Sequence, residues 1–160
     1  MLGKLGDVFA LIGFVLSLLL VFRTNSAYER WWEGRKKWGE LINNCRNLAI
    51  KIDTMTADKS YQDFFSRMIP NYAFAMKEHL RLGVKVEELE LTEEELEEIS
   101  KKGHKTSYIA QKMYWQLNEM KKNKELSEEE FLSIDVNLKT FSDITGACER
   151  IKNTPIPYSY

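Results

Sequence analysis

One apolar stretch near the start of the chain constrains the fold more than any other feature. Fifteen residues, Val8 to Phe22, pass without a charged side chain. A helix over that length spans about 22 Å, which is less than the ~30 Å hydrocarbon core of a bilayer. Extension back to Met1 supplies the missing length but includes Lys4 and Asp7. The stretch therefore predicts a membrane-spanning helix that is marginal by itself and needs neighbouring helices.

Three other interpretations fit the same stretch. A signal peptide has such an apolar core, but here one lysine precedes it and no A-x-A cleavage site follows. By length alone, a buried helix of a globular protein or a stand-alone anchor is equally compatible. The flanking charges favour a membrane span with its C-terminal side in the cytoplasm, because Lys4 alone precedes the stretch and five basic residues follow it closely. These are Arg23, Arg30, Arg35, Lys36 and Lys37.

The apolar stretch runs without a proline into good helix formers, so we expect one helix from the membrane through Ile52. It would far exceed the globular mean of about 11–12 residues, so other helices or copies of the chain must support it. We interpret Tyr28, Trp31 and Trp32 as packing residues between cytoplasmic helices, with an interfacial aromatic belt as the alternative. Three- and four-residue spacing indicates a buried face at Trp38, Leu41 or Ile42, Cys45, Leu48 or Ala49, and Ile52.

Capping and breaking residues divide the rest of the chain into further helices. Asp58 as N-cap and Gly83 past the end predict a helix over residues 58–82, kinked or broken by Pro70. Capping boxes open helices at Thr92 and at Ser127, and another helix is expected over residues 106–122. We therefore expect an all-α fold, in which one transmembrane helix continues into a long cytoplasmic helical bundle.

The last of these helices carries an unbroken apolar seam. Its three- and four-residue spacing requires a long partner, such as the first helix. The seam consists of Phe131, Ile134, Leu138, Phe141, Ile144, Cys148 and Ile151.

Eight glutamates fall between Glu87 and Glu98. We interpret this run as a solvated surface, because Glu97 and Glu98 are spaced for i,i+4 pairs with Lys101 and Lys102. A cation-attracting surface near a pore is the alternative.

Composition and spacing argue against several classes of function. Lys plus Arg is 23 and Asp plus Glu is 24, so the chain has no basic excess of the kind that nucleic-acid binding usually requires. Cys45 and Cys148 fall on the predicted cytoplasmic side, where we expect buried, reduced thiols. His79 and His104 are isolated in the sequence, so no metal site is predicted. The sequence has no glycine-rich phosphate loop and no evident nucleophile–base cluster, so we expect neither enzymatic activity nor a cofactor.

Two segments carry specific motifs. FRTNSAYERWWEGRKKWGEL, at residues 22–41, contains Phe22-Arg23, an Asn-x-x-Tyr-x-Arg motif from Asn25 to Arg30, and a Gly-Arg-Lys-x-Trp-Gly motif from Gly34 to Gly39. DITGACERIKNTPIPYSY occupies residues 143–160. The first segment resembles the bacterial branch of the bestrophin family of ion channels, and the second is similar to the family's segment leading into its third transmembrane helix. The two segments bracket the chain, so the resemblance covers all of it.

The resemblance implies that the chain is a fragment of a larger subunit. Family members have four transmembrane helices and assemble as pentamers around one central pore. On that basis residues 1–23 form a transmembrane pore helix, residues 24–154 a cytoplasmic helical domain, and residues 155–160 the start of a truncated following segment. The family's second transmembrane helix narrows the pore at a hydrophobic neck, to which Phe14, Leu18 and Phe22 would correspond. A second, cytoplasmic aperture would fall around Leu132 and Ile134.

The implied function is that of a pore-forming subunit of a bestrophin-like channel in the cell membrane, which passively conducts chloride or other small ions through the neck. The implied partners are membrane lipid, permeant small ions and other copies of the chain in a homopentamer. Without the resemblance, the stripe formed by Phe14, Leu18 and Phe22 would be interpreted as helix packing. The alternative function, from a different class, is a single-span, membrane-anchored helical signalling or scaffold protein.

Overall fold

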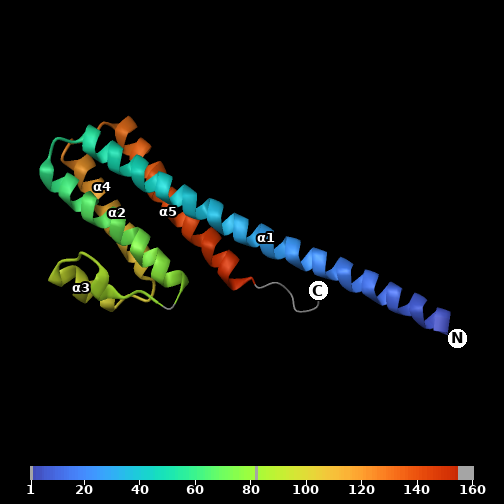
Figure 1. Cartoon of the computed structure of the whole chain (residues 1–160). Coiled ribbons are helices and arrows are strands. Elements are labelled where there is room, and N and C mark those ends of the chain that lie inside the picture. The colour runs from blue at the N-terminus through green and yellow to red at the C-terminus, as the bar shows by residue number, and fades with distance from the viewer. Residues whose placement is uncertain (1, 82, 155–160) are drawn as a thin grey trace.

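The computed structural model describes residues 2–81 and 83–154 of the chain. In these residues the fold is all-α, as predicted (Figure 1). Its elements are α1 (Leu2–Met55), α2 (Lys59–Leu80), a 3-10 turn η1 (Val86–Glu88), α3 (Glu93–Ser100), α4 (Lys105–Lys122) and α5 (Glu128–Asn153). The expected segment at residues 155–160 lies outside the described residues.

A single uninterrupted helix, α1, sets the length of the molecule. Its 54 residues extend over about 80 Å at the usual helical rise. Figure 1 shows that the C-terminal part of α1 packs beside the other helices, whereas the N-terminal part projects far beyond them. The predicted continuity from the apolar stretch through Ile52 is therefore confirmed.

The C-terminal part of α1 forms an up-down-up-down bundle with α2, α4 and α5, in which each helix contacts its two neighbours. On α1, Leu41, Leu48 and Ile52 are buried as predicted, while the alternatives Ile42 and Ala49 are exposed. The seam of α5 lies against α1, so the predicted long partner of that helix is confirmed. The fully buried centre of the bundle includes Phe65, Met68, Tyr72, Met76, Ile109, Met113, Leu117, Met120, Ile134, Leu138, Phe141 and Ile144.

α2 remains one helix through Pro70, so the proline does not break it. Pro70 lies on the exposed side of α2, where water can bond to the carbonyl that the missing N–H leaves free. The helix starts as predicted, since Asp58 accepts a hydrogen bond from the N–H of Ser60 at 2.8 Å. It ends at Leu80, two residues before the predicted end. Gly83, at φ +111°, donates its N–H to the carbonyl of Glu78 at 2.9 Å and closes that end.

Both capping boxes form as predicted, at Thr92–Glu95 before α3 and at Ser127–Glu130 before α5. The short helix α3 lies to one side of the bundle, near α4 (Figure 1).

The prediction that the glutamate run is a solvated surface is correct only in part. Glu97 pairs with Lys101 at 2.6 Å as predicted. Glu98 instead pairs with Lys112 at 2.7 Å, because α4 packs beside α3 and brings a closer ammonium group than Lys102. Glu95 is buried, with its carboxylate against the Arg67 guanidinium.

Candidate functional site

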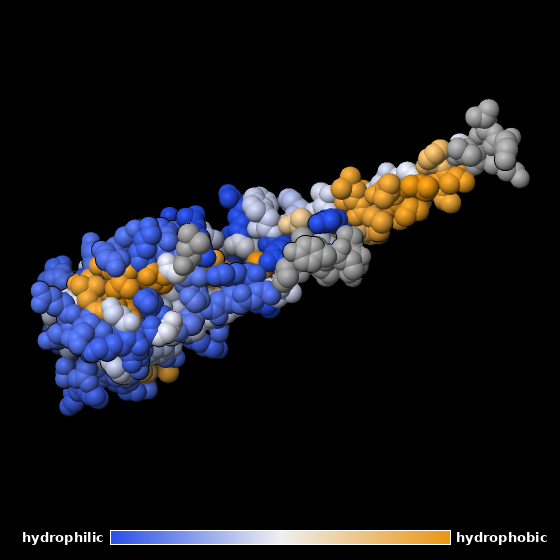
Figure 2. Space-filling view, turned by 90° about the horizontal axis from the view of Figure 1, so that it is seen from below, coloured by the Kyte–Doolittle hydropathy of each residue, from blue (hydrophilic) through white to orange (hydrophobic). Residues whose placement is uncertain are grey.

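The N-terminal part of α1 is apolar and bare. Figure 2 shows it as an orange rod that projects from a largely blue bundle. From Val8 to Phe22 every large apolar side chain is at least 44% exposed. Among the described residues, α1 is the one helix long and apolar enough to cross a membrane. Such a surface requires lipid or other protein around it, because water would have to hydrate it otherwise.

The hydroxyl groups of Ser17 and Thr24 are satisfied by the helix itself. Ser17 donates to the carbonyl of Gly13 at 2.8 Å, and Thr24 donates to the carbonyl of Leu20 at 2.8 Å. A hydroxyl that bonds to its own helix needs no water, so these side chains are compatible with the hydrocarbon core of a bilayer.

The predicted neck residues share one side of α1 and point away from the bundle. Phe14, Leu18 and Phe22 are 67%, 45% and 57% exposed. At about 100° per residue, this stripe lies roughly 140° around the helix from the face that contains Leu41 and Leu48. Those two leucines are fully buried in the bundle. In the bundle the chain covers one side of α1, and the stripe continues the opposite side into the N-terminal segment, where every side is exposed.

The two residues of the predicted cytoplasmic aperture point in different directions. Leu132 is 54% exposed, and Val136, one turn later on α5, is 60% exposed. Ile134 has no exposed surface, because it belongs to the seam that packs inside the bundle. Ile134 thus cannot line an aperture while the bundle is intact, and Leu132 is the one member of the pair that faces outward.

Arg30 joins the projecting part of α1 to the end of α5. Its guanidinium donates hydrogen bonds to the backbone carbonyls of Ile151 and Thr154. These carbonyls lie at a helix C-terminus, where the backbone leaves acceptors unpaired and the helix dipole favours a cation. Beside this contact, Arg150 pairs with Glu33 at 2.6 Å. The motif arginine at position 30 therefore attaches the C-terminal end of α5 to α1.

A buried polar network, which no sequence pattern predicted, sets the register between α1 and α5. The side-chain amide of Asn44 donates to the backbone carbonyl of Asn137 at 2.9 Å, and the side-chain amide of Asn137 donates to Asn44 Oδ1 at 2.7 Å. Lys51, about two turns after Asn44 on α1, donates to Asn137 Oδ1 at 2.7 Å and to the backbone carbonyl of Ser133 at 2.8 Å. Sliding α5 by one turn would leave these buried groups unpaired, so the network resists that motion.

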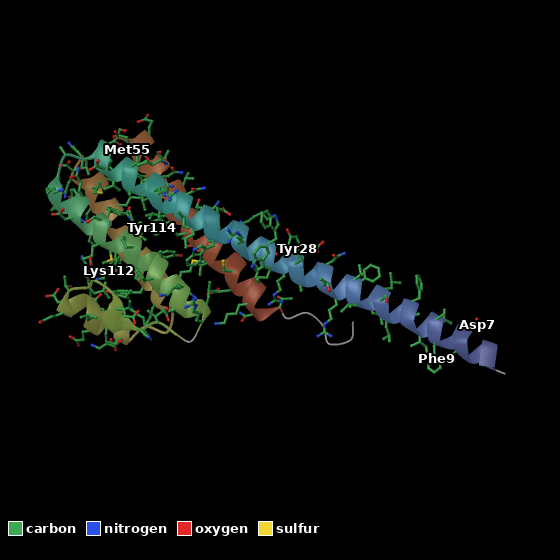
Figure 3. The ribbon with its side chains drawn as sticks, viewed as in Figure 1. Asp7, Phe9, Tyr28, Met55, Lys112 and Tyr114 are labelled. Atoms are coloured by element: carbon green, nitrogen blue, oxygen red, sulfur yellow. The ribbon has the colours of Figure 1, made fainter. Side chains whose placement is uncertain are left out.

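The aromatic cluster past the apolar stretch does not pack between helices of this chain. Tyr28, Trp31 and Trp32 are 58%, 56% and 44% exposed and stack loosely on one another. Figure 3 shows Tyr28 on α1 just where the end of α5 reaches it. Trp38, further along α1, is partly buried against the core as predicted.

Comparison with known proteins defines the class. The family described as bacterial/fungal bestrophin protein matches residues 5–160. The chain therefore belongs to the bacterial/fungal bestrophin family.

Individual relatives agree with this assignment. The chain is 36% identical over 157 residues to a voltage-dependent anion channel-forming protein of Nostoc, a match that covers 91% of this chain and 50% of that protein. It is 30% identical to the voltage-dependent anion channel-forming protein YneE of Escherichia coli, over 95% of this chain and 51% of that protein. The chain thus spans about half the length of the curated relatives it matches.

Solved structures share the fold. Crystal structures of two mutants of a bacterial bestrophin homolog from Klebsiella pneumoniae superpose with TM-scores of 0.91 and 0.87, at 24% and 25% identity. Each match covers 95% of this chain, and the shares of the Klebsiella chains are 58% and 57%. The long helix and its bundle are thus an arrangement found in that protein.

Proposed function

We propose that the chain is the pore-lining helix and cytoplasmic bundle of a bestrophin-like ion-channel subunit, which conducts small ions passively. The observation that carries the proposal is the exposed apolar stripe of Phe14, Leu18 and Phe22, which continues along α1 the side opposite the leucines buried in the bundle. Copies of the chain around a symmetry axis can turn these stripes toward one another while their bundles stay outside. The family resemblance supports five copies, and the names of the relatives favour anions such as chloride over cations.

The charge distribution supports an orientation in the cell membrane. Arg23, Arg30 and the basic residues from Arg35 to Lys37 all follow the apolar segment. Basic residues next to a span remain on the cytoplasmic side, so the bundle is cytoplasmic and the N-terminal end of α1 is the far side of the neck. Residues 1–23 are then the membrane-spanning pore segment, and residues 24–154 are the cytoplasmic domain.

The proposed neck blocks ions by excluding water from the pore. A ring of apolar side chains gives an ion no ligand to replace its hydration shell. A narrow ring can empty of water and close the pore, and a wider or wetted ring conducts. No proton transfer or covalent step is involved, so Phe14, Leu18 and Phe22 are gating residues and not catalytic ones. On the cytoplasmic side, Leu132 is the residue proposed for the second aperture, in place of Ile134.

Replacement of the three stripe residues by alanine tests the proposal. The stretch corresponding to residues 5–160 is grafted into the Nostoc relative in place of its matched half, and the graft is reconstituted in liposomes. Chloride and potassium fluxes are measured together with oligomer size. The Phe14→Ala/Leu18→Ala/Phe22→Ala variant should keep its oligomer and pass ions several-fold faster, because the ring becomes wider and less dry.

A matched control changes the opposite side of the same segment. Leu16 and Leu20 are similarly exposed but lie about 200° around α1 from Phe14 and Leu18, so their replacement by alanine should leave the flux unchanged. Unchanged or lower flux from an intact triple-variant oligomer would contradict the neck assignment. Loss of the oligomer would instead identify the stripe as packing, at about 2–5 kcal/mol for each large side chain removed.

A further inference from the structure

The only two histidines of the chain, 25 residues apart in the sequence, meet at one glutamate. His79 is in the last turn of α2, His104 is the N-cap of α4, and Glu149 is in the penultimate turn of α5. The Nε2 atoms of His79 and His104 lie 2.7 and 2.8 Å from the same Oε1 of Glu149. The two imidazole rings are 4.6 Å apart between centroids. Three helices thus bring three side chains to one point at the bundle end nearer the projecting part of α1.

We propose that His79, His104 and Glu149 form a binding site for a divalent transition-metal ion of the zinc type. Their ligand atoms lie within 4.8 Å of one another. Zinc binds imidazole nitrogen and carboxylate oxygen at about 2.0–2.2 Å, so tetrahedral ligands are about 3.3 Å apart. Small side-chain rotations convert the present cluster into that arrangement. Water would take the fourth position, because all three side chains are partly exposed, at 27%, 42% and 31%.

The charge at the cluster suits a cation. A glutamate carboxylate is an anion at neutral pH, and the Oε1 atom of Glu149 lies within hydrogen-bond distance of both imidazole rings. The nearby ammonium of Lys152 is held elsewhere, since it donates to the backbone carbonyl of His79 at 3.0 Å.

Metal binding requires a specific tautomer of His104, and the surrounding groups can supply it. A neutral imidazole that binds metal through Nε2 carries its proton on Nδ1, which needs an acceptor. The hydroxyl oxygens of Ser107 and Thr106 lie 2.8 and 2.9 Å from that nitrogen. Either hydroxyl can turn to accept the proton. The cost is the capping bond from the Ser107 N–H, a contact of 3.2 Å.

Zinc titration of the purified 160-residue chain in detergent tests the site. Competition with a chromophoric chelator should give one ion bound per chain. The variants His79→Gln, His104→Asn and Glu149→Gln should each weaken zinc binding by more than about 100-fold. Loss of a residue that only hydrogen-bonds to a metal ligand commonly costs about 10–100-fold in affinity, and these variants remove the ligands themselves. His104→Asn retains a side-chain acceptor for the N-terminus of α4, so circular dichroism should show unchanged helicity.

The controls separate this site from other zinc ligands. Glu97→Gln removes an exposed carboxylate that pairs only locally with Lys101 and should bind zinc like the parent chain. Cobalt(II) should give the visible bands of a tetrahedral nitrogen–oxygen site, without the near-ultraviolet charge-transfer band that thiolate ligands from Cys45 or Cys148 produce. Absence of zinc binding by the folded parent, equal binding by all three variants, or a thiolate band would overturn the proposal. None of these readouts depends on ion conduction, so the site and the channel proposal can fail separately.

Discussion

At the scale of single residues, the bundle of this bestrophin-family chain is held by polar groups matched inside it. Among the described residues, each buried side-chain nitrogen or oxygen has a hydrogen-bond partner. Tyr72 is an example: its hydroxyl, in the centre of the core, bonds to the carbonyl of Phe141 at 2.9 Å and to the Thr145 hydroxyl at 2.7 Å. Because an unmatched buried group costs about 1–3 kcal/mol, these residues specify one packing arrangement among many.

The ion pair between Arg67 and Glu95 predicts a pH-dependent stability. Burial would raise the Glu95 pKa, but Arg67 and the Thr92 N–H together hold it below its ordinary value of 4.5. The pair therefore stabilises the fold fully above that value, and the contribution disappears as the pH falls through the lowered pKa. We expect Glu95→Gln to reduce the free energy of unfolding by about 1–3 kcal/mol at pH 7.

Denaturant titrations of both chains between pH 7 and pH 3, followed by circular dichroism, check this expectation. The difference between parent and variant should shrink toward zero at the acid end. A difference that stays constant across this range would show that the lost contact is not ionic. Glu97→Gln is the matched control, since that carboxylate is exposed and paired with Lys101 on the surface.

The two thiols should react slowly in the folded chain. Burial raises the pKa of Cys45 to about 11 and also raises the pKa of Cys148. The thiolate is the reactive form, so at pH 7 Cys45 should label with a water-soluble maleimide more than about 100-fold slower than an exposed cysteine. A Ser100→Cys variant, on the exposed side of α3, supplies the comparison rate, and mass spectrometry reads both. Equal rates would place Cys45 outside the packed interface.

At the scale of the secondary-structure elements, local sequence signals located the helices well. The capping boxes at Thr92 and Ser127 and the N-cap at Asp58 involve residues two or three positions apart, so the sequence contains both partners of each bond. Arrangements between distant residues were not predictable in this way. Glu98 selects Lys112, and His79 meets His104 at Glu149, because helix packing places them together. Spacing placed Ile134 in the packing seam, whereas the family resemblance implied an aperture there, and the bundle buries Ile134 completely.

The end of α4 offers a direct test of helix termination. Lys124 adopts a left-handed conformation at φ 60°, and the N–H groups of Lys124 and Glu125 bond back to the carbonyls of Lys121 and Met120 at 3.1 and 3.0 Å. This is a Schellman motif, whose left-handed position favours glycine. Lys124→Gly should raise the free energy of unfolding by about 1 kcal/mol, measured by denaturant titration.

A substitution next to it controls for the loss of charge. Lys122→Gln also removes a basic side chain near the end of α4 but leaves the left-handed residue in place, so its stability should change little. A Lys124→Gly variant less stable than the parent would show that the left-handed conformation at this position is not the strained feature.

At the scale of the whole molecule, one rigid rod combines two environments. The N-terminal part of α1 has an apolar surface on every side, and its C-terminal part is one member of a polar-surfaced bundle (Figure 2). Arg30 and the Asn44–Asn137 pair attach α5 to this rod at two levels. A shift of the bundle relative to the membrane would therefore be transmitted along α1 to the stripe. Ion conduction through this molecule requires that the stripe face a pore.

The most direct test is chemical modification at the stripe. In the Nostoc graft with Cys45 and Cys148 replaced by alanine, a Leu18→Cys variant is treated in liposomes with a charged methanethiosulfonate reagent, and flux is recorded before and after. A Leu16→Cys variant, on the opposite side of α1, is treated in parallel. We predict a several-fold change of flux for Leu18→Cys, since a charge enters the apolar ring, and no change for Leu16→Cys. Modification of Leu18→Cys that leaves the flux unaltered, or equal effects at both positions, would contradict the pore-lining assignment.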